Sequence, residues 1–152
     1  MSSRIQKIQT LVDLAEIEEG KSAKTFAELQ SQYKHHLQQL EMLNAYVNEY
    51  AQANVSKGQA VSPIQILSTQ AFVSKLQHAI QAESDKTDEL LNLTERSREV
   101  WMEKRTRLNA LKKLLAKLIQ DRQARIDKQE QRFLDELSGQ SFHKNSEENN
   151  GF

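Results

Sequence analysis

The chain has 152 residues, with 28% charged and 38% hydrophobic residues, a net charge of +0, four glycines, one proline and no cysteine. This apolar content is too low for a thick globular core but sufficient for a narrow seam between helices. The scarcity of turn residues argues against a β domain, and the lack of cysteine excludes a disulfide framework and a thiolate metal site.

The first part of the chain predicts one long helix, from about Ser3 to about Asn54. Apolar or amphipathic residues recur there on an alternating three-four spacing, which is typical of a coiled-coil seam. His36 falls on this spacing and is interpreted as a packed, neutral histidine rather than a metal ligand. The fourteen seam positions are Ile5, Ile8, Val12, Ala15, Glu19, Ser22, Phe26, Leu29, Tyr33, His36, Leu40, Leu43, Val47 and Tyr50, and eleven are apolar or amphipathic.

A second helix is predicted from about residue 62 to about Leu137. Ser62 can cap its start, Pro63 suits the first turn, and Gln65 can bond back to the cap. The turn is expected at about residues 55–61 around Gly58. The second seam comprises Ile66, Val73, Leu76, Ile80, Leu90, Trp101, Leu108, Leu111, Leu115 and Leu118. Residues 139–152 are expected to form a disordered polar tail.

A short connection makes neighbouring helices antiparallel, so the predicted fold is all-α, an antiparallel coiled-coil hairpin shaped as a rod. With the turn centred near Lys57, Ile5 should lie near Leu108, and Phe72 should lie opposite Leu43. The second helix should then overhang the first from about residue 113.

The predicted overhang is not polar, so it should need a partner. Self-association into a homodimer is the alternative explanation for its apolar residues. Those residues are Leu114, Leu115, Leu118, Ile119, Ile126, Phe133, Leu134 and Leu137.

Polar residues interrupt both seams in the middle of the expected rod. Gly20 adds ~1 kcal/mol of helix penalty there relative to alanine. Residues 17–31 should face residues 83–97, which suggests either a hinge or an ordinary imperfect coiled coil. The interruptions are Glu19, Gly20 and Ser22 in the first seam and Glu83, Thr87, Thr94 and Ser97 in the second.

Charge is concentrated in the second half, where residues 96–132 hold twelve Lys or Arg and five Asp or Glu. Because these bases alternate with acids and seam residues, a solvated face or a surface for an acidic protein is favoured over nucleic acid. The sequence has no glycine-rich phosphate loop and no histidine pair spaced for a metal. We therefore expect a non-enzyme without cofactor or metal, soluble and cytoplasmic, with no inserted membrane segment.

An aromatic cluster lies near the expected turn. Tyr46 and Tyr50 are four residues apart on the first helix, as are Phe72 and Leu76 on the second. Aromatic residues are enriched in protein interfaces, although they could equally just close the hairpin end. Tyr46 and Phe72 lie off the strict seam and are the better candidates for an exposed patch.

Three segments together resemble the flagellar export protein FliJ family, namely Gln39–Tyr50, Phe72–Ile80 and Trp101–Leu108. The resemblance implies a small antiparallel coiled coil similar to the central shaft of rotary ATP synthases. It also implies a cytoplasmic component of the flagellar type III export apparatus, peripheral at the cytoplasmic face of the inner membrane.

The resemblance further implies three partners: the flagellar export ATPase ring, the membrane export gate protein FlhA, and export chaperones. The implied gate-binding residues are Gln39, Leu43, Tyr46, Tyr50, Phe72, Leu76 and Ala79. We expect the ATPase to bind the end of the hairpin opposite the turn. A thin, basic, apolar helix can enter the central hole of a ring. The family's likeness to a rotary shaft also implies that the chain termini lie in that ring. The expected ATPase-binding residues are Lys112, Lys113, Leu115, Lys117, Leu118, Arg122 and Arg125. A nucleic-acid-associated coiled coil using the Lys104 to Lys128 face and a structural homo-oligomer are the alternatives.

Overall fold

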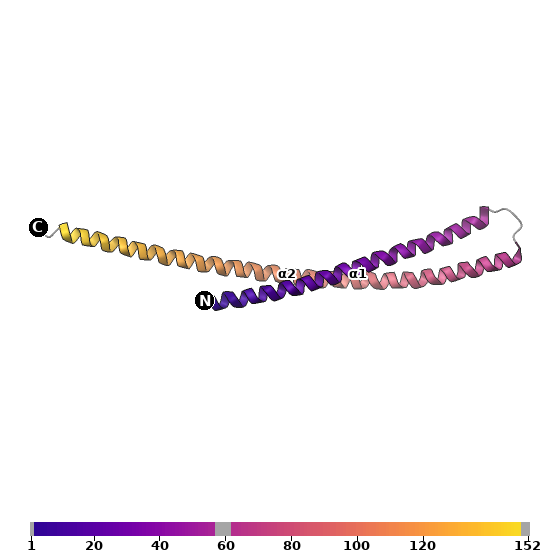
Figure 1. Ribbon diagram of the computed structural model, residues 1–152, viewed down its shortest axis with the longest axis horizontal. Helices are drawn as coiled ribbons and strands as arrows, with labels where there is room; N and C mark the ends of the chain where they lie inside the picture. Colours follow the sequence, from indigo (N-terminus) through magenta and orange to yellow (C-terminus); the bar gives the residue numbers. More distant parts are fainter. Residues whose placement is uncertain (1, 57–61, 150–152) are drawn as a thin grey trace. The chain divides into compact units, whose positions relative to one another are not determined.

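Two long helices account for the described part of the chain, residues 2–56 and 62–149, in a computed structural model (Figure 1). The helix α1 spans Ser2–Ser56, and α2 spans Pro63–Asn149. The two helices pack against each other, which confirms the predicted all-α hairpin. The centre of the predicted turn, around Gly58, lies outside the described residues. Within the described part, neither helix is long and apolar enough to cross a membrane.

The start of α2 is capped as its sequence predicts. The backbone N–H of Gln65 donates to Oγ of Ser62 over 3.3 Å. The backbone N–H of Ile66 donates to the Ser62 carbonyl oxygen over 3.2 Å. The Ser62 side chain thus satisfies the N–H of Gln65, one of those that the first turn of a helix leaves without an intrahelical partner, while the Ser62 carbonyl accepts the first intrahelical bond.

The packing divides the chain into two compact units. The first, here called the hairpin unit, comprises Ile17–Arg105 and contains the connection between the helices. The second, here called the terminal unit, comprises Met1–Glu16 and Thr106–Phe152.

The predicted seam positions face inward along both helices. Of the fourteen positions predicted for α1, every one is buried or half-buried except Tyr50. On α2 the exception is Ile66, which is exposed. The three-four spacing therefore identified the packed face of each helix, and it failed only at the positions closest to the turn.

Contacts within the hairpin unit show that α1 and α2 are antiparallel there. Nζ of Lys104 lies 3.2 Å from Oε2 of Glu18. His36 bonds through Nδ1 to the carboxylate of Glu83. Because the residue number on α2 falls as that on α1 rises, the helices run in opposite directions.

Trp101 shows that the predicted register was wrong by a few residues. Its indole Nε1 donates to Oε1 of Glu19 over 2.9 Å. Its ring stacks on Phe26 with centroids 5.6 Å apart and planes 8° apart. The mean residue number of the Glu19–Trp101 pair is 60, whereas the prediction centred the turn near Lys57. The pairs of the hairpin unit are therefore centred about three residues later than predicted.

Two threonines on α2 occupy the seam without disrupting it. Thr87 is 5% exposed and Thr94 is 6% exposed, and Leu90 between them is also buried. The Thr87 hydroxyl donates to the Glu83 carbonyl over 2.7 Å. The Thr94 hydroxyl donates to the Leu90 carbonyl over 2.6 Å. Because each hydroxyl is satisfied within its own helix, these short side chains can be buried at little cost. The predicted interruptions at Thr87 and Thr94 therefore do not expose the seam there.

The terminal unit has its own small core. Val12 and Ala15 of α1 pack with Leu108 of α2, and all three are buried. Leu111 and Leu115 extend this cluster along α2. The predicted proximity of Ile5 to Leu108 was wrong, because Leu108 packs further along α1. Ile5 lines a pocket with Leu118 instead.

Beyond Leu118, α2 has no covered face in the part of the chain that the structure describes. Every residue from 119 to 149 is exposed. The helix also continues through Gly139 to Asn149, so residues 139–149, expected in a polar tail, are helical. A single glycine costs a helix only ~1 kcal/mol, which is not enough by itself to end it. The overhang therefore begins near residue 119, several residues later than the predicted 113.

Candidate protein-binding surfaces

The seven residues predicted to bind the export gate, here called the aromatic surface, all lie in the hairpin unit. Leu43 and Leu76 are half-buried in the seam, whereas Gln39 and Ala79 are exposed. The aromatic members are also exposed: Tyr46 by 51%, Tyr50 by 39% and Phe72 by 42%. The surface thus combines half-buried leucines at the edge of the seam with aromatic side chains that are exposed to solvent.

Tyr50 and Phe72 form an aromatic contact between the helices. Their ring centroids are 4.8 Å apart, and the ring planes are tilted by 41°. The prediction paired Phe72 with Leu43 and placed Tyr50 inside the seam. The register shift changes the partner of Phe72, and Tyr50 stays accessible beside it. The two rings therefore make one continuous patch from both helices.

Tyr46 lies on a separate face of α1. It lines a hollow of about 250 Å³ with Met42, Ala45 and Glu49, all of them on α1. Met42 is 59% exposed, more than any of the three aromatic residues. The seam spacing did not identify Met42 as a surface residue. An apolar side chain four residues before Tyr46 and off the seam was the signal that could have identified it.

A hydrogen-bonded group borders the aromatic surface on one side. Nε2 of Gln39 lies 3.1 Å from Nε2 of His35. The neighbouring His36 bonds to Glu83, with both side chains partly buried. His36 is therefore packed in the seam as predicted, but it has a charged partner across the helix pair. Glu83 is engaged within the chain at the edge of the surface.

Three further apolar residues are exposed at the start of α2, namely Ile64, Ile66 and Leu67. The prediction placed Ile66 in the seam. Ile64 and Leu67 are three residues apart, so they share one face of the helix. Together with Phe72, they give the beginning of α2 an apolar exterior.

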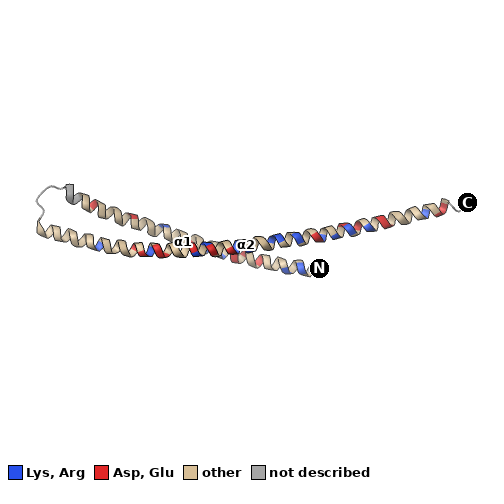
Figure 2. Cartoon of the chain, turned by 180° about the vertical axis from the view of Figure 1, so that it is seen from behind, with Lys and Arg blue, Asp and Glu red and all other residues tan. Residues whose placement is uncertain are grey.

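The seven residues predicted to bind the ATPase, here called the basic segment, lie in the terminal unit between Lys112 and Arg125. Figure 2 shows basic residues, with some acidic ones among them, on the half of α2 nearer the C-terminus, and the segment itself contains Asp121. Lys113, Lys117, Arg122 and Arg125 are exposed. Nζ of Lys112 lies 3.4 Å from Oε1 of Glu16 on α1.

The two leucines of the basic segment do not belong to the overhang. Leu115 packs against the core of the terminal unit, and Leu118 lines the pocket with Ile5. Both leucines are half-buried. They hold α2 against α1, so the exposed part of the basic segment is its charged side chains.

The exposed side chains of these surfaces are of types that are common in protein interfaces. Within residues 2–56 and 62–149, no three His, Asp or Glu side chains are grouped so that they could hold a metal ion. The hollows are lined by one or two helices and are small. Exposed aromatic side chains and arginines are the residue types that dominate binding energy in protein interfaces.

Comparisons with known proteins agree with this description. The family model described as flagellar FliJ protein matches residues 4–147 of the chain. A flagellar FliJ protein of Salmonella typhi is 30% identical over 117 residues, which cover 76% of each chain. No solved structure matches the chain.

Proposed function

The chain belongs to the flagellar FliJ family, and from this premise we propose that it is the coiled-coil component that connects the export ATPase ring to the export gate protein FlhA. Membership supports a role in the flagellar export apparatus. In this proposal the aromatic surface binds the gate and the basic segment binds the ATPase. In this role the protein catalyses no reaction and acts by holding its two partners together.

The observation that carries the proposal is that the two surfaces belong to different packing units. The aromatic surface lies within Ile17–Arg105, and the basic segment lies within Thr106–Phe152. They also differ in chemistry, because one presents aromatic rings and the other presents guanidinium and ammonium groups. Two such surfaces can bind two different proteins at once without competing for the same residues.

We further propose that the protein acts at the cytoplasmic face of the membrane at the flagellar base and that it handles export chaperones there. The exposed helix from residue 119 to residue 149 supports a chaperone role. A single helix with apolar residues such as Ile126 and Phe133 on its surface can pack into a groove of another helical protein.

Two variants test the assignment of the surfaces. The first carries Tyr46→Ala and Phe72→Ala in the full chain. Loss of exposed aromatic anchors commonly costs ~2 kcal/mol or more each at an interface, so binding to the gate protein should fall by more than tenfold. Binding to the ATPase should persist.

The second variant ends after Leu118. Of the residues that it removes, 119–149 are all exposed, so the core around Leu108 and Leu115 stays intact. Binding to the ATPase should fall while binding to the gate persists. Titrations of both partners with both variants measure these effects, and circular dichroism reports the helix content. If either variant loses both partners while its helices remain folded, the two surfaces do not act separately.

A further inference from the structure

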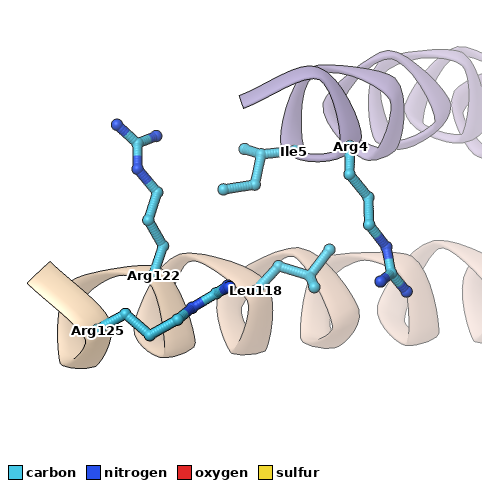
Figure 3. Close-up of a pocket in the computed structure, with 5 residues that line it drawn as sticks. All are labelled: Arg4, Ile5, Leu118, Arg122 and Arg125. Carbon is cyan, nitrogen blue, oxygen red and sulfur yellow. The ribbon is translucent and has the colours of Figure 1, made fainter. Parts of the chain in front are cut away.

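A pocket in the terminal unit combines three arginines with an apolar floor (Figure 3). Its volume is about 340 Å³, within the range of small binding pockets. Arg4 and Ile5 come from α1, and Leu118, Arg122 and Arg125 come from α2. Figure 3 shows Ile5 and Leu118 between the two helices, with Arg4 and Arg122 projecting from opposite helices.

The charge of the pocket is not neutralised by its own lining. No Asp or Glu is among the five lining residues. Among the side chains that the structure describes, neither Arg4 nor Arg122 has an ion-pair or hydrogen-bond partner. The other interhelical cation of this unit, Lys112, is paired with Glu16. The two guanidinium groups are therefore available to an anion from outside the chain.

We propose that this pocket binds a short acidic segment of a protein partner, with one apolar side chain on Ile5 and Leu118 and flanking carboxylates on Arg4 and Arg122. A planar guanidinium matches a carboxylate through two parallel hydrogen bonds. The apolar floor of Ile5 and Leu118 also selects a ligand with an apolar side chain, which attraction between charges alone would not do. The inference rests on the proposed function for the identity of the partner, which would be the export ATPase.

The apolar floor favours a peptide over nucleic acid or a membrane. A phosphate backbone would contact the arginines but leave Ile5 and Leu118 without a matching group. An anionic lipid surface would attract every exposed base of α2 rather than a site built from both helices. A peptide with a leucine between glutamates supplies both kinds of contact in one segment.

Fluorescence anisotropy with labelled peptides tests the site on the full chain. The probe is a short helix-forming peptide of glutamates with leucine at every third or fourth position. One comparison peptide has glutamine in place of every glutamate, and another has alanine in place of every leucine. The variant Arg4→Gln/Arg122→Gln removes the two unpaired guanidiniums, and the control Arg107→Gln/Arg132→Gln removes equal charge from exposed positions outside the pocket.

We expect the acidic leucine peptide to bind, and both comparison peptides to bind at least tenfold more weakly. The pocket variant should lose at least tenfold in affinity, and the control variant much less. The site is wrong if the control variant loses as much, if the alanine peptide binds equally well, or if a single-stranded DNA oligonucleotide binds more tightly and displaces the peptide.

Measuring ATPase binding with the same two variants separates this inference from the proposed function. Loss of both peptide and ATPase in the pocket variant supports the site and its partner. Loss of peptide with full retention of the ATPase supports the pocket as an acidic-segment site and overturns the ATPase as its occupant.

Discussion

Trp101 joins α2 to α1 in the hairpin unit by donating its indole N–H to Glu19, with Nε1 and Oε1 2.9 Å apart. The same ring stacks on Phe26, and the Arg105 guanidinium lies over it at 5.6 Å from the centroid. A hydrogen bond and a stacked ring fix one residue of α2 against two positions of α1. This single tryptophan of the chain therefore helps to set the register of the helix pair.

Replacing Trp101 by phenylalanine should destabilise the hairpin without removing the stacked ring. The variant loses the N–H donor to a carboxylate, which we expect to cost about 1 kcal/mol in the free energy of unfolding because the site is only half-buried. Glu19→Gln should cost less, since its amide oxygen can still accept. The measurement is urea unfolding followed by circular dichroism.

The double variant Trp101→Phe/Glu19→Gln provides the control. If the hydrogen bond is the source of the loss, the double variant should be little less stable than Trp101→Phe alone. Fully additive losses would show that the two side chains act independently.

The sequence predicted the packed faces but not how they match. The three-four spacing identifies inward positions because every residue of a seam must face the partner helix, whatever that partner is. The spacing does not say which residue of one helix lies opposite which residue of the other, and the Glu19–Trp101 pair is centred about three residues later than the predicted Lys57. In the observed register Phe72 contacts Tyr50, and Leu115 and Leu118, which follow the seam spacing, lie against α1 instead of in the expected overhang.

Polar seam residues were the second source of error. Thr87 and Thr94 looked like interruptions because their hydroxyls need partners, and a sequence pattern does not show that both bond to their own helix. Met42 was missed for the opposite reason. It is apolar but lies off the seam, and only the structure shows that it shares a hollow with Tyr46.

Amide hydrogen exchange should be slower around Thr87 and Thr94 than at the start of α2. Residues 87–94 include three buried side chains, whereas residues 66–80 include none. Local opening is easier where few apolar contacts hold a helix. Exchange measured by mass spectrometry or NMR should therefore show greater protection in residues 87–94. Equal protection in both stretches would contradict this reading of the burial.

Gly20→Ala should stabilise the protein. A Cβ atom built at Gly20 meets nothing within 4 Å, and the residue lies inside α1. Alanine removes the conformational penalty of glycine in a helix, so the free energy of unfolding should rise by roughly 0.5–1 kcal/mol. Thermal unfolding measures the gain.

The same substitution tests the hinge suggested by the sequence. If bending at Gly20 is required, Gly20→Ala should reduce export activity in cells while it increases stability. Unchanged motility with increased stability would leave Gly20 without a functional role. Ala23→Gly, which introduces a glycine one turn away, is the matched variant and should lower stability by a similar amount.

Met42→Ser should weaken binding to the export gate while leaving the fold intact. Met42 is largely exposed and lies beside Tyr46 in the hollow of α1, so a partner that covers Tyr46 should also cover Met42. Truncating a covered apolar side chain at an interface commonly costs ~1 kcal/mol, which corresponds to about a fivefold loss in affinity. Because the side chain is outside the seam, the unfolding midpoint should change little.

Leu93→Ser is the matched control, since Leu93 is also an exposed apolar residue of the hairpin unit but is not part of the aromatic surface. Isothermal titration of the gate protein compares the two variants with the unmodified chain. A larger loss for Met42→Ser than for Leu93→Ser would extend the gate surface from the Tyr50–Phe72 patch onto the outer face of α1. Equal losses would mean that the gate responds to general surface hydrophobicity, and the hollow around Tyr46 would then have no special part in binding.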